Sequence, residues 1–194
     1  MGLTLTVAPN EEPIGLAEAK LHLRVDGNTE DALIGAIIVA ARQQAEYLTG
    51  RALVTQEWSL TAPAFPYGGD LSIYLPRPPL QAIDSITYLD ADGSPQTLAM
   101  AAYQVVTDEL VGRAVPAYGQ SWPTCREMPG AVEVAFTAGY GAAADVPQDI
   151  KHWMLLTIAT LYAQREAIVI GTIGEIPRQF HDGLLDGYRL WRVA

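Results

Sequence analysis

The hydrophobic pattern is most informative between Val132 and Glu166. Hydrophobic and polar side chains alternate from Val132 to Thr137, with Val134 and Phe136 on the hydrophobic side. A spacing of two is that of a β-strand with one buried face. The sequence therefore predicts a strand that ends at Thr137.

A helix is predicted directly after this strand. Gly139 and Gly141 permit positive φ angles in the connection, Asp145 offers a capping oxygen, and Pro147 suits a first helical turn. The positions that follow are hydrophobic or small at helical spacing and around a second side as well: Ile150, Trp153, Met154, Leu155, Leu156, Ile158, Ala159, Leu161, Tyr162 and Ala163. Because such a helix needs cover on two sides, we expect the rest of the chain to pack around it.

The residues before position 51 predict a short extended arm and two helices. Leu3, Leu5 and Val7 alternate, and the prolines at 9 and 13 block a helix there, so this stretch is an arm or an edge strand. Residues 14–25 are rich in helix formers and end in a turn signal, which predicts a short first helix.

The second helix has a clear beginning and end in the sequence. Asn28 or Thr29 can cap it, and acidic residues follow in its first turn. One face is apolar, and Gly50 stands where a left-handed cap ends a helix. We expect Trp153 and Ile158 to be buried against this second helix.

The period changes from helical to strand-like after Gly50. Alternating runs predict about six short strands, separated by proline, glycine and aspartate turns: residues 56–61, 71–75, 83–88, 103–107, 113–117 and 132–137. Residues 119–130 are predicted to form a loop. The strands would make a small sandwich or a distorted barrel.

These elements predict an α+β fold in which N- and C-terminal helices form a bundle around an inserted β-rich subdomain. The expected divisions are an arm and helices at 1–50, the insert at 51–138, a core helix at 139–170 and a tail at 171–194.

Composition excludes several functional classes. The chain has 194 residues, of which 49% are hydrophobic, and 22 acidic residues against 12 basic ones give a formal charge of −10. Binding nucleic acid by phosphate neutralisation needs clustered lysine and arginine, which this chain lacks. No apolar run approaches the roughly 20 residues of a membrane span, and the first ten residues do not resemble a signal peptide, so we expect a protein made in the cytoplasm.

No catalytic, cofactor or metal motif is recognisable. His22, His152 and His181 are far apart, and Cys125 is the single cysteine, so it is interpreted as a structural or incidental thiol. For His152 a surface or satisfied histidine is weighed against a metal ligand or base, which would need partners that the spacing does not show.

Three other features have two readings each. The aspartates 90 and 92 with Gly93 match a hairpin turn better than a calcium loop, because the bidentate acid of such a loop is missing. The segment 139–141 suits a strand-to-helix connection better than a phosphate loop, because no lysine follows in register. Arg42, Arg51 and Arg165 are interpreted as solvated or ion-paired.

Several short segments, in this order and spacing, resemble the head-tail connector family of tailed bacteriophages and gene transfer agents, also called adaptor or head-completion proteins. The segments are IGLAEAK from residue 14, ARQQAEYLTGRAL from residue 41, LPRPPL from residue 75, ITYLDADG from residue 86, GYG from residue 139, and VPQDIK from residue 146 followed by LYAQRE from residue 161. The resemblance extends from about residue 13 to residue 166.

The resemblance implies a structural virion protein without enzymatic activity or cofactor. It implies a homo-oligomeric, dodecameric ring docked under the portal protein at the head-tail interface, joined to a tail, stopper or terminator protein, with DNA passing through the bore without sequence-specific binding. An acidic bore would keep a moving duplex from adhering. A small enzyme or ligand-binding domain with a site that the sequence does not reveal is the alternative reading.

The C-terminal tail differs from the rest in composition. Residues 176–194 carry three arginines against two aspartates, and they are rich in aromatic and aliphatic side chains. Tryptophan, tyrosine and arginine are the residue types that most often anchor interfaces. The predicted partner-binding residues are therefore Tyr188, Arg189, Leu190, Trp191 and Arg192. In the other reading, Leu190 and Trp191 fold back on their own domain.

Overall fold

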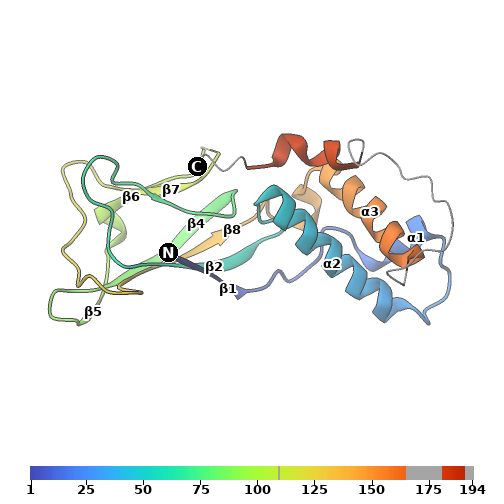
Figure 1. Ribbon diagram of the computed structural model, residues 1–194, viewed down its shortest axis with the longest axis horizontal. Helices are drawn as coiled ribbons and strands as arrows, with labels where there is room; N and C mark the ends of the chain where they lie inside the picture. The colour runs from blue at the N-terminus through green and yellow to red at the C-terminus, as the bar shows by residue number, and fades with distance from the viewer. Residues whose placement is uncertain (109, 165–180, 191–194) are drawn as a thin grey trace. The chain divides into compact units, whose positions relative to one another are not determined.

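The computed structural model describes residues 1–108, 110–164 and 181–190, and the chain divides into two compact units (Figure 1). The strand unit comprises Met1–Asn10 and Thr55–Tyr140, and the helical unit comprises Glu11–Val54 and Gly141–Ala194. Helices and antiparallel sheets are both present, so the predicted α+β class is confirmed. The residues that the sequence predicts as an arm or an edge strand form β1, Gly2–Val7, an edge strand of the strand unit.

The strand unit contains two antiparallel sheets. The five-stranded sheet has the order β1-β2-β8-β4-β5, with β2 at Gln56–Ala62, β4 at Leu80–Leu89, β5 at Pro95–Thr97 and β8 at Val132–Ala138. The three-stranded sheet has the order β3-β7-β6, with β3 at Ile73–Tyr74, β6 at Tyr103–Val106 and β7 at Arg113–Pro116. The five-stranded sheet is open, with β1 and β5 at its edges, so these strands form no closed barrel.

Strand β8 is the centre of the five-stranded sheet because it pairs with β2 on one side and β4 on the other. Phe136 lies opposite Trp58 of β2 and Ile83 of β4, and it is fully buried. Val132 and Val134 are buried as well, which confirms the predicted alternation. A buried strand with two neighbours needs this apolar face.

Two strands differ from the sequence prediction in length or position. β4 begins at Leu80, three residues before the predicted start, and β3 is only two residues long. The Leu80 side chain packs against Gly112, where an added Cβ would lie 2.4 Å from the Leu80 Cβ. This close approach is a tertiary feature that periodicity does not reveal.

Among the described residues, three α-helices form the bundle of the helical unit: α1 at Leu16–Leu23, α2 at Asp31–Thr49 and α3 at Gln148–Ala163. Each of the three contacts the other two. Trp153, Met154 and Ile158 of α3 are buried together with Ile34, Ile38 and Ala41 of α2. The helix that the sequence predicts to need cover is therefore a core element of this unit.

The C-terminal end of α2 agrees with the prediction, whereas its N-terminal end differs from it. Gly50 ends α2 in a left-handed conformation with φ 75°, as predicted. The N-cap residue of α2 is Glu30, which makes no side-chain capping bond, so the capping role predicted for Asn28 or Thr29 is wrong. Asp145 caps a preceding 3-10 turn, η2 (Ala143–Asp145), where its Oδ2 accepts a bond from the Ala142 amide, and α3 begins after Pro147.

No helix among the described residues is long and apolar enough to cross a membrane.

Candidate partner-binding segment

Residues 181–190 pack against the helices of the helical unit. In the sequence they come before Trp191 and Arg192, the last two predicted binding residues. They contain the 3-10 helix η3, Gly183–Tyr188, which contacts both α2 and α3. Leu185 is fully buried and provides the main apolar anchor. A 3-10 turn suits this sequence because Gly183 and Gly187 disfavour a longer α-helix.

Trp153 of α3 holds the beginning of this segment. Its indole ring stacks on the imidazole of His181 at a centroid distance of 5.0 Å, and its Nε1 donates a hydrogen bond of 3.4 Å to Asp182 Oδ1. The Thr157 hydroxyl lies 3.3 Å from His181 Nε2. These contacts give His181 a structural role, so it is partnered on α3.

The C-terminal end of α2 holds the other end of the segment. Arg51 Nε donates a 2.7 Å hydrogen bond to the Tyr188 carbonyl, and the Leu190 amide donates a 2.9 Å bond to the Thr49 carbonyl. The carbonyls in the last turn of a helix have no partner within it, so the bond from Leu190 satisfies one of them. The Leu190 side chain covers Gly50, where an added Cβ would lie 3.3 Å from Leu190 Cδ1.

Tyr188 is the aromatic residue of this anchored end. Its hydroxyl lies 3.4 Å from Asp149 Oδ2, at the start of α3. Partial burial, together with the charge of Asp149 and the hydrogen bond to it, raises the pKa of the Tyr188 phenol above its usual value of 10.0. The phenol is therefore neutral at physiological pH and serves as a hydrogen-bond donor.

Arg189 forms ion pairs within the segment. Its Nε lies 3.3 Å from Asp186 Oδ1, and its Nη2 lies 3.9 Å from Asp182 Oδ2. The side chain is 30% exposed, so these are surface pairs of small energetic value. The exposed part of the side chain is open to a partner.

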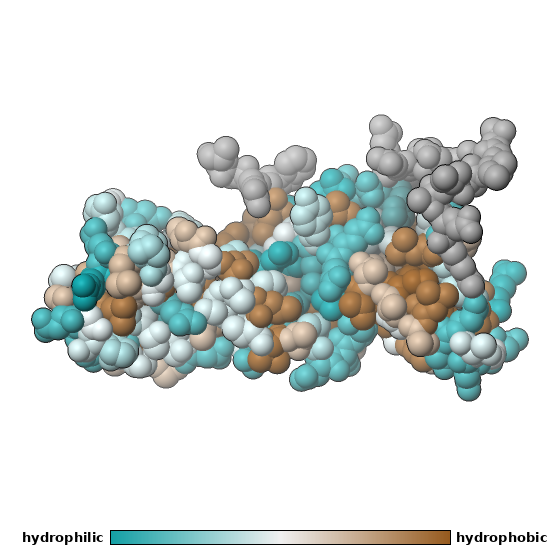
Figure 2. Space-filling model, turned by 60° about the horizontal axis from the view of Figure 1, so that its bottom comes forward, coloured by the Kyte–Doolittle hydropathy of each residue, from teal (hydrophilic) through white to brown (hydrophobic). Residues whose placement is uncertain are grey.

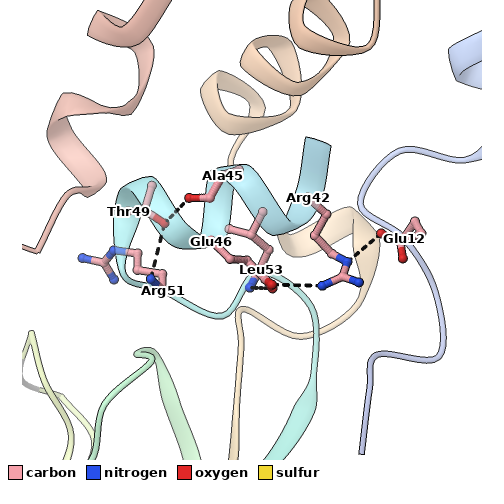
Figure 3. Close-up of polar contacts among 7 residues, drawn as sticks. All are labelled: Glu12, Arg42, Ala45, Glu46, Thr49, Arg51 and Leu53. Atoms are coloured by element: carbon pink, nitrogen blue, oxygen red, sulfur yellow. Dashed lines mark hydrogen bonds and ion pairs between the residues drawn. The ribbon is translucent and has the colours of Figure 1, made fainter. Parts of the chain in front are cut away.

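A buried charge cluster supports α2 near this anchor (Figure 3). Arg42 donates from Nε to Glu12 Oε2 at 2.7 Å and from Nη1 to Glu46 Oε2 at 2.9 Å. The Glu46 carboxylate also accepts the Leu53 amide at 3.1 Å. Arg42 is ion-paired, as one of the predicted readings had it, but it is buried, which its place in the helical pattern did not indicate.

Three of the five predicted binding residues can be placed. Tyr188, Arg189 and Leu190 lie side by side at the end of the anchored segment, whereas Trp191 and Arg192 fall outside the described residues. Leu190 contacts its own unit through Thr49 and Gly50, as the second reading of the tail expects for this residue. Arg165 also falls outside the described residues.

The sequence did not reveal which residues hold the tail. Thr49, Arg51 and Trp153 anchor residues that follow them by 28 to 141 positions in sequence, too far for any local pattern to indicate. The one available signal was the unusual content of large apolar residues, such as Leu185, in a tail without helical periodicity.

The other candidates of the sequence have structural surroundings. Asp90 accepts amide bonds from Asp92 and Ser94 in the turn between β4 and β5, which is the predicted hairpin. Residues 139–141 connect β8 to η2, with positive φ at both glycines. His22 and His152 are exposed. The described part of the chain has no cluster of three or more histidine, cysteine or acidic residues suited to a metal ion.

Comparison of the sequence with known protein families finds a match. Residues 13–92 match the family described as phage gp6-like head-tail connector protein. No curated protein matches the chain in sequence.

Solved structures resemble the chain over its whole length. A chain in the neck of an empty gene transfer agent (GTA) particle, computed with six-fold symmetry, matches with a TM-score of 0.82 and 26% identity, covering 100% of this chain and 98% of the other. Chains from the virion of a native particle and from a native neck computed with twelve-fold symmetry match with TM-scores of 0.81 and 0.80, at the same identity and coverage.

The match over residues 13–92 includes α1, α2 and the first strands that follow them, and the structural likeness extends to the C-terminus. Together these findings confirm the resemblance to the phage head-tail connectors and support a structural connector role for this chain.

Proposed function

We propose that this protein is a subunit of the ring that joins the head of a phage or gene transfer agent particle to its tail. The observation that carries the proposal is the likeness over the full length of both chains to a protein in the neck of a gene transfer agent particle. The family description over residues 13–92 names the same role. The protein would act by assembly, as a structural component without catalytic activity, at the head-tail interface after synthesis in the host cytoplasm.

The proposed assembly is a closed ring, with twelve copies as the proposed number. The related necks were computed with six-fold and twelve-fold symmetry, which supports a ring in the virion. In a cyclic ring, each subunit meets its neighbours through two different faces. A ring of this kind leaves a central bore for DNA.

The proposed bore is acidic. The chain carries a net charge of −10, and like charge keeps a duplex from adhering while it moves. A neck in which lysine and arginine dominate the bore would contradict this part of the proposal.

The proposed partners are the portal on the head side and a tail, stopper or terminator protein on the other. We assign portal binding to the C-terminal residues Tyr188, Arg189, Leu190, Trp191 and Arg192. The contacts of Arg51 and Thr49 hold the chain in place as far as Leu190. The segment after Leu190 therefore starts from a fixed point on the helical unit. Aromatic and arginine side chains at such a point suit an interface anchor.

Truncation can test this assignment. Removing residues 191–194 should abolish portal binding and leave the thermal stability unchanged, because the described anchor ends at Leu190. The matched comparison is Leu190→Ala, which should lower the stability because it uncovers Gly50. Portal binding that survives the truncation would rule out a role for Trp191 and Arg192.

The experiment that tests the connector role is an assembly assay in cells that produce the particle. Without this protein, we expect filled heads that lack tails, and particles from unaltered cells should contain the protein at the neck in electron micrographs with a specific antibody. Particles that acquire tails without it would refute the proposal. A purified monomer with a bound small molecule would instead support the reading as a ligand-binding domain or an enzyme.

A further inference from the structure

Beyond its first residue, Asp31, the solvent side of α2 carries no charge. Its exposed residues between Asp31 and Thr49 are alanine, leucine, glutamine and tyrosine, namely Ala32, Leu33, Ala36, Ala40, Gln43, Gln44 and Tyr47. The two charged residues in this stretch, Arg42 and Glu46, are buried and paired with each other. A helix that faces water in an acidic protein ordinarily carries charge on that side.

The uncharged side of α2 continues onto α3 through a shallow groove. The groove is lined by Leu33, Ala36, Ile37 and Ala40 of α2 and by Leu161 and Gln164 at the end of α3. Leu33 and Leu161 are each 39% exposed, and Tyr47 is 81% exposed further along α2. Figure 2 shows hydrophobic surface, drawn brown, over the helices at the right of the view. We call these groove residues together with Tyr47 the α2–α3 face.

Charges at the beginning of α2 are satisfied within the helical unit. Glu30 accepts a hydrogen bond from the Tyr162 hydroxyl, and Asp31 forms a 2.7 Å ion pair with Lys20. Both carboxylates at this edge of the face therefore have partners within the protein and do not depend on water alone. The surroundings of the groove suit close contact with an apolar surface better than contact with a charged one.

We propose that the α2–α3 face is the surface through which one copy of this chain contacts the next in the ring. The inference rests on the proposed function, since the neighbour is a second copy only if the protein forms a ring. A ring requires each copy to contact the next, and net charge restricts which surface can serve for that contact. Two copies that each carry −10 repel one another, and acids outnumber bases too far for every charge at a contact to be paired.

A charge-free face removes this difficulty. Interface cores are depleted of charged residues, as the α2–α3 face is, and tyrosine, here Tyr47, is common in them. Small residues at Ala36 and Ala40 let a neighbouring surface approach the helix closely, and Leu33 and Leu161 border the groove with apolar side chains. The neighbour would present a different face, because contacts in a cyclic ring are heterologous.

The test places a photo-crosslinking benzophenone amino acid at Ala40 in cells that produce the particle. The expected product after illumination is a covalent dimer of this chain. An adduct with a different protein would overturn the inference and assign the groove to the portal or the tail. Crosslinks confined within one chain would also overturn it, because another part of the same chain would then cover the groove.

A matched pair of variants separates charge from shape. Ala40→Gln and Ala40→Glu add side chains of nearly the same size, and only the second adds a charge. Ala40→Glu should reduce incorporation into particles roughly tenfold or more relative to Ala40→Gln, because it leaves an unpaired charge between like-charged copies. The melting temperature of the two purified variants should be the same, since Ala40 is exposed.

Ala17→Glu on the exposed side of α1 controls for the added negative charge itself. Incorporation should be unaffected by this variant, and a loss equal to that of Ala40→Glu would refute a specific role for the face. If the unaltered protein is found at the neck and Ala40→Glu does not reduce incorporation into particles, the inference fails and the connector role stands. If unaltered protein is absent from particles, the connector role itself fails.

Discussion

In the helical unit the carboxylates of Glu12 and Glu46 lie beside the guanidinium of Arg42, whereas in the strand unit those of Asp70 and Asp90 lie at the surface in turns. The pair of Glu12 and Arg42 joins residues 30 positions apart in the sequence, whereas the bonds to Asp70 and Asp90 come from residues within a few positions. Glu12 therefore fixes tertiary structure, whereas Asp70 and Asp90 fix local turns. The same chemistry has different energetic weight because burial removes the screening by water.

The positions of the buried cluster add to this contrast. Glu12 follows directly after the point where the chain leaves the strand unit, and Leu53, whose amide binds Glu46, precedes the point where it returns. Glu11 accepts the Ala143 amide just after the third crossing. The chain passes between the two units three times. Next to each passage, a carboxylate holds the adjoining segment of the helical unit.

The largest expected effect is in the core of the strand unit. Phe136→Ala should lower the free energy of unfolding by about 3–5 kcal/mol, because Phe136 is fully buried on the central strand between β2 and β4. Hydrogen exchange should show the loss of protection first in β2, β4 and β8. Val105→Ala, at a 39% exposed position in the same unit, is the control and should have little effect. Equal loss of protection in α2 and α3 would mean that the two units unfold as one.

Arg42→Met tests the buried cluster of the helical unit. It should cost about 3–5 kcal/mol, since it leaves the carboxylate of Glu46 buried without its cation. The double variant Arg42→Met with Glu46→Gln should recover much of this loss, because glutamine keeps an acceptor for the Leu53 amide without the charge. Denaturant titration measures both. A double variant as unstable as the single one would show that packing of the arginine, and not its charge, is what matters.

Ile158→Ala tests the core of the same unit without changing any charge. Ile158 is fully buried on α3, and the cavity left by this change should cost about 2–5 kcal/mol in thermal or denaturant unfolding. Leu161→Ala, one turn further along α3 at a 39% exposed position, should cost much less. If Ile158→Ala leaves the midpoint unchanged, α3 is not a core helix.

The smallest effect is expected at the exposed turn of Asp90. The side-chain bond from Gln96, with amide bonds from Ser94 and neighbouring residues, holds the pKa of Asp90 below its usual value of 3.8. Because the folded pKa is the lower one, the contribution to stability is present above pH 3.8 and is lost as the pH falls through the folded pKa. Carboxyl NMR should show the Asp90 midpoint rising towards 3.8 in Gln96→Ala. An unchanged midpoint would remove Gln96 as the main cause.

Local pattern alone determined most of the secondary structure of this protein. The alternation at Val132, Val134 and Phe136 predicted β8 and its buried face, and the apolar positions of α2 and α3 predicted two core helices. Gly50 was predicted as a left-handed cap and has that conformation. These predictions succeed because the periods of helices and strands, and the turn preferences of glycine, depend on neighbouring residues only.

Only the tertiary structure decided how these elements combine. The order β1-β2-β8-β4-β5 brings residues from both ends of the chain's first 138 positions into one sheet, and Arg51 finds the Tyr188 carbonyl 137 positions away. The side chain of Leu80, where β4 begins, packs closely against Gly112. These contacts depend on which surfaces, far apart in the sequence, pack best against each other. Hydrophobic periodicity shows that a face is buried but not which element covers it.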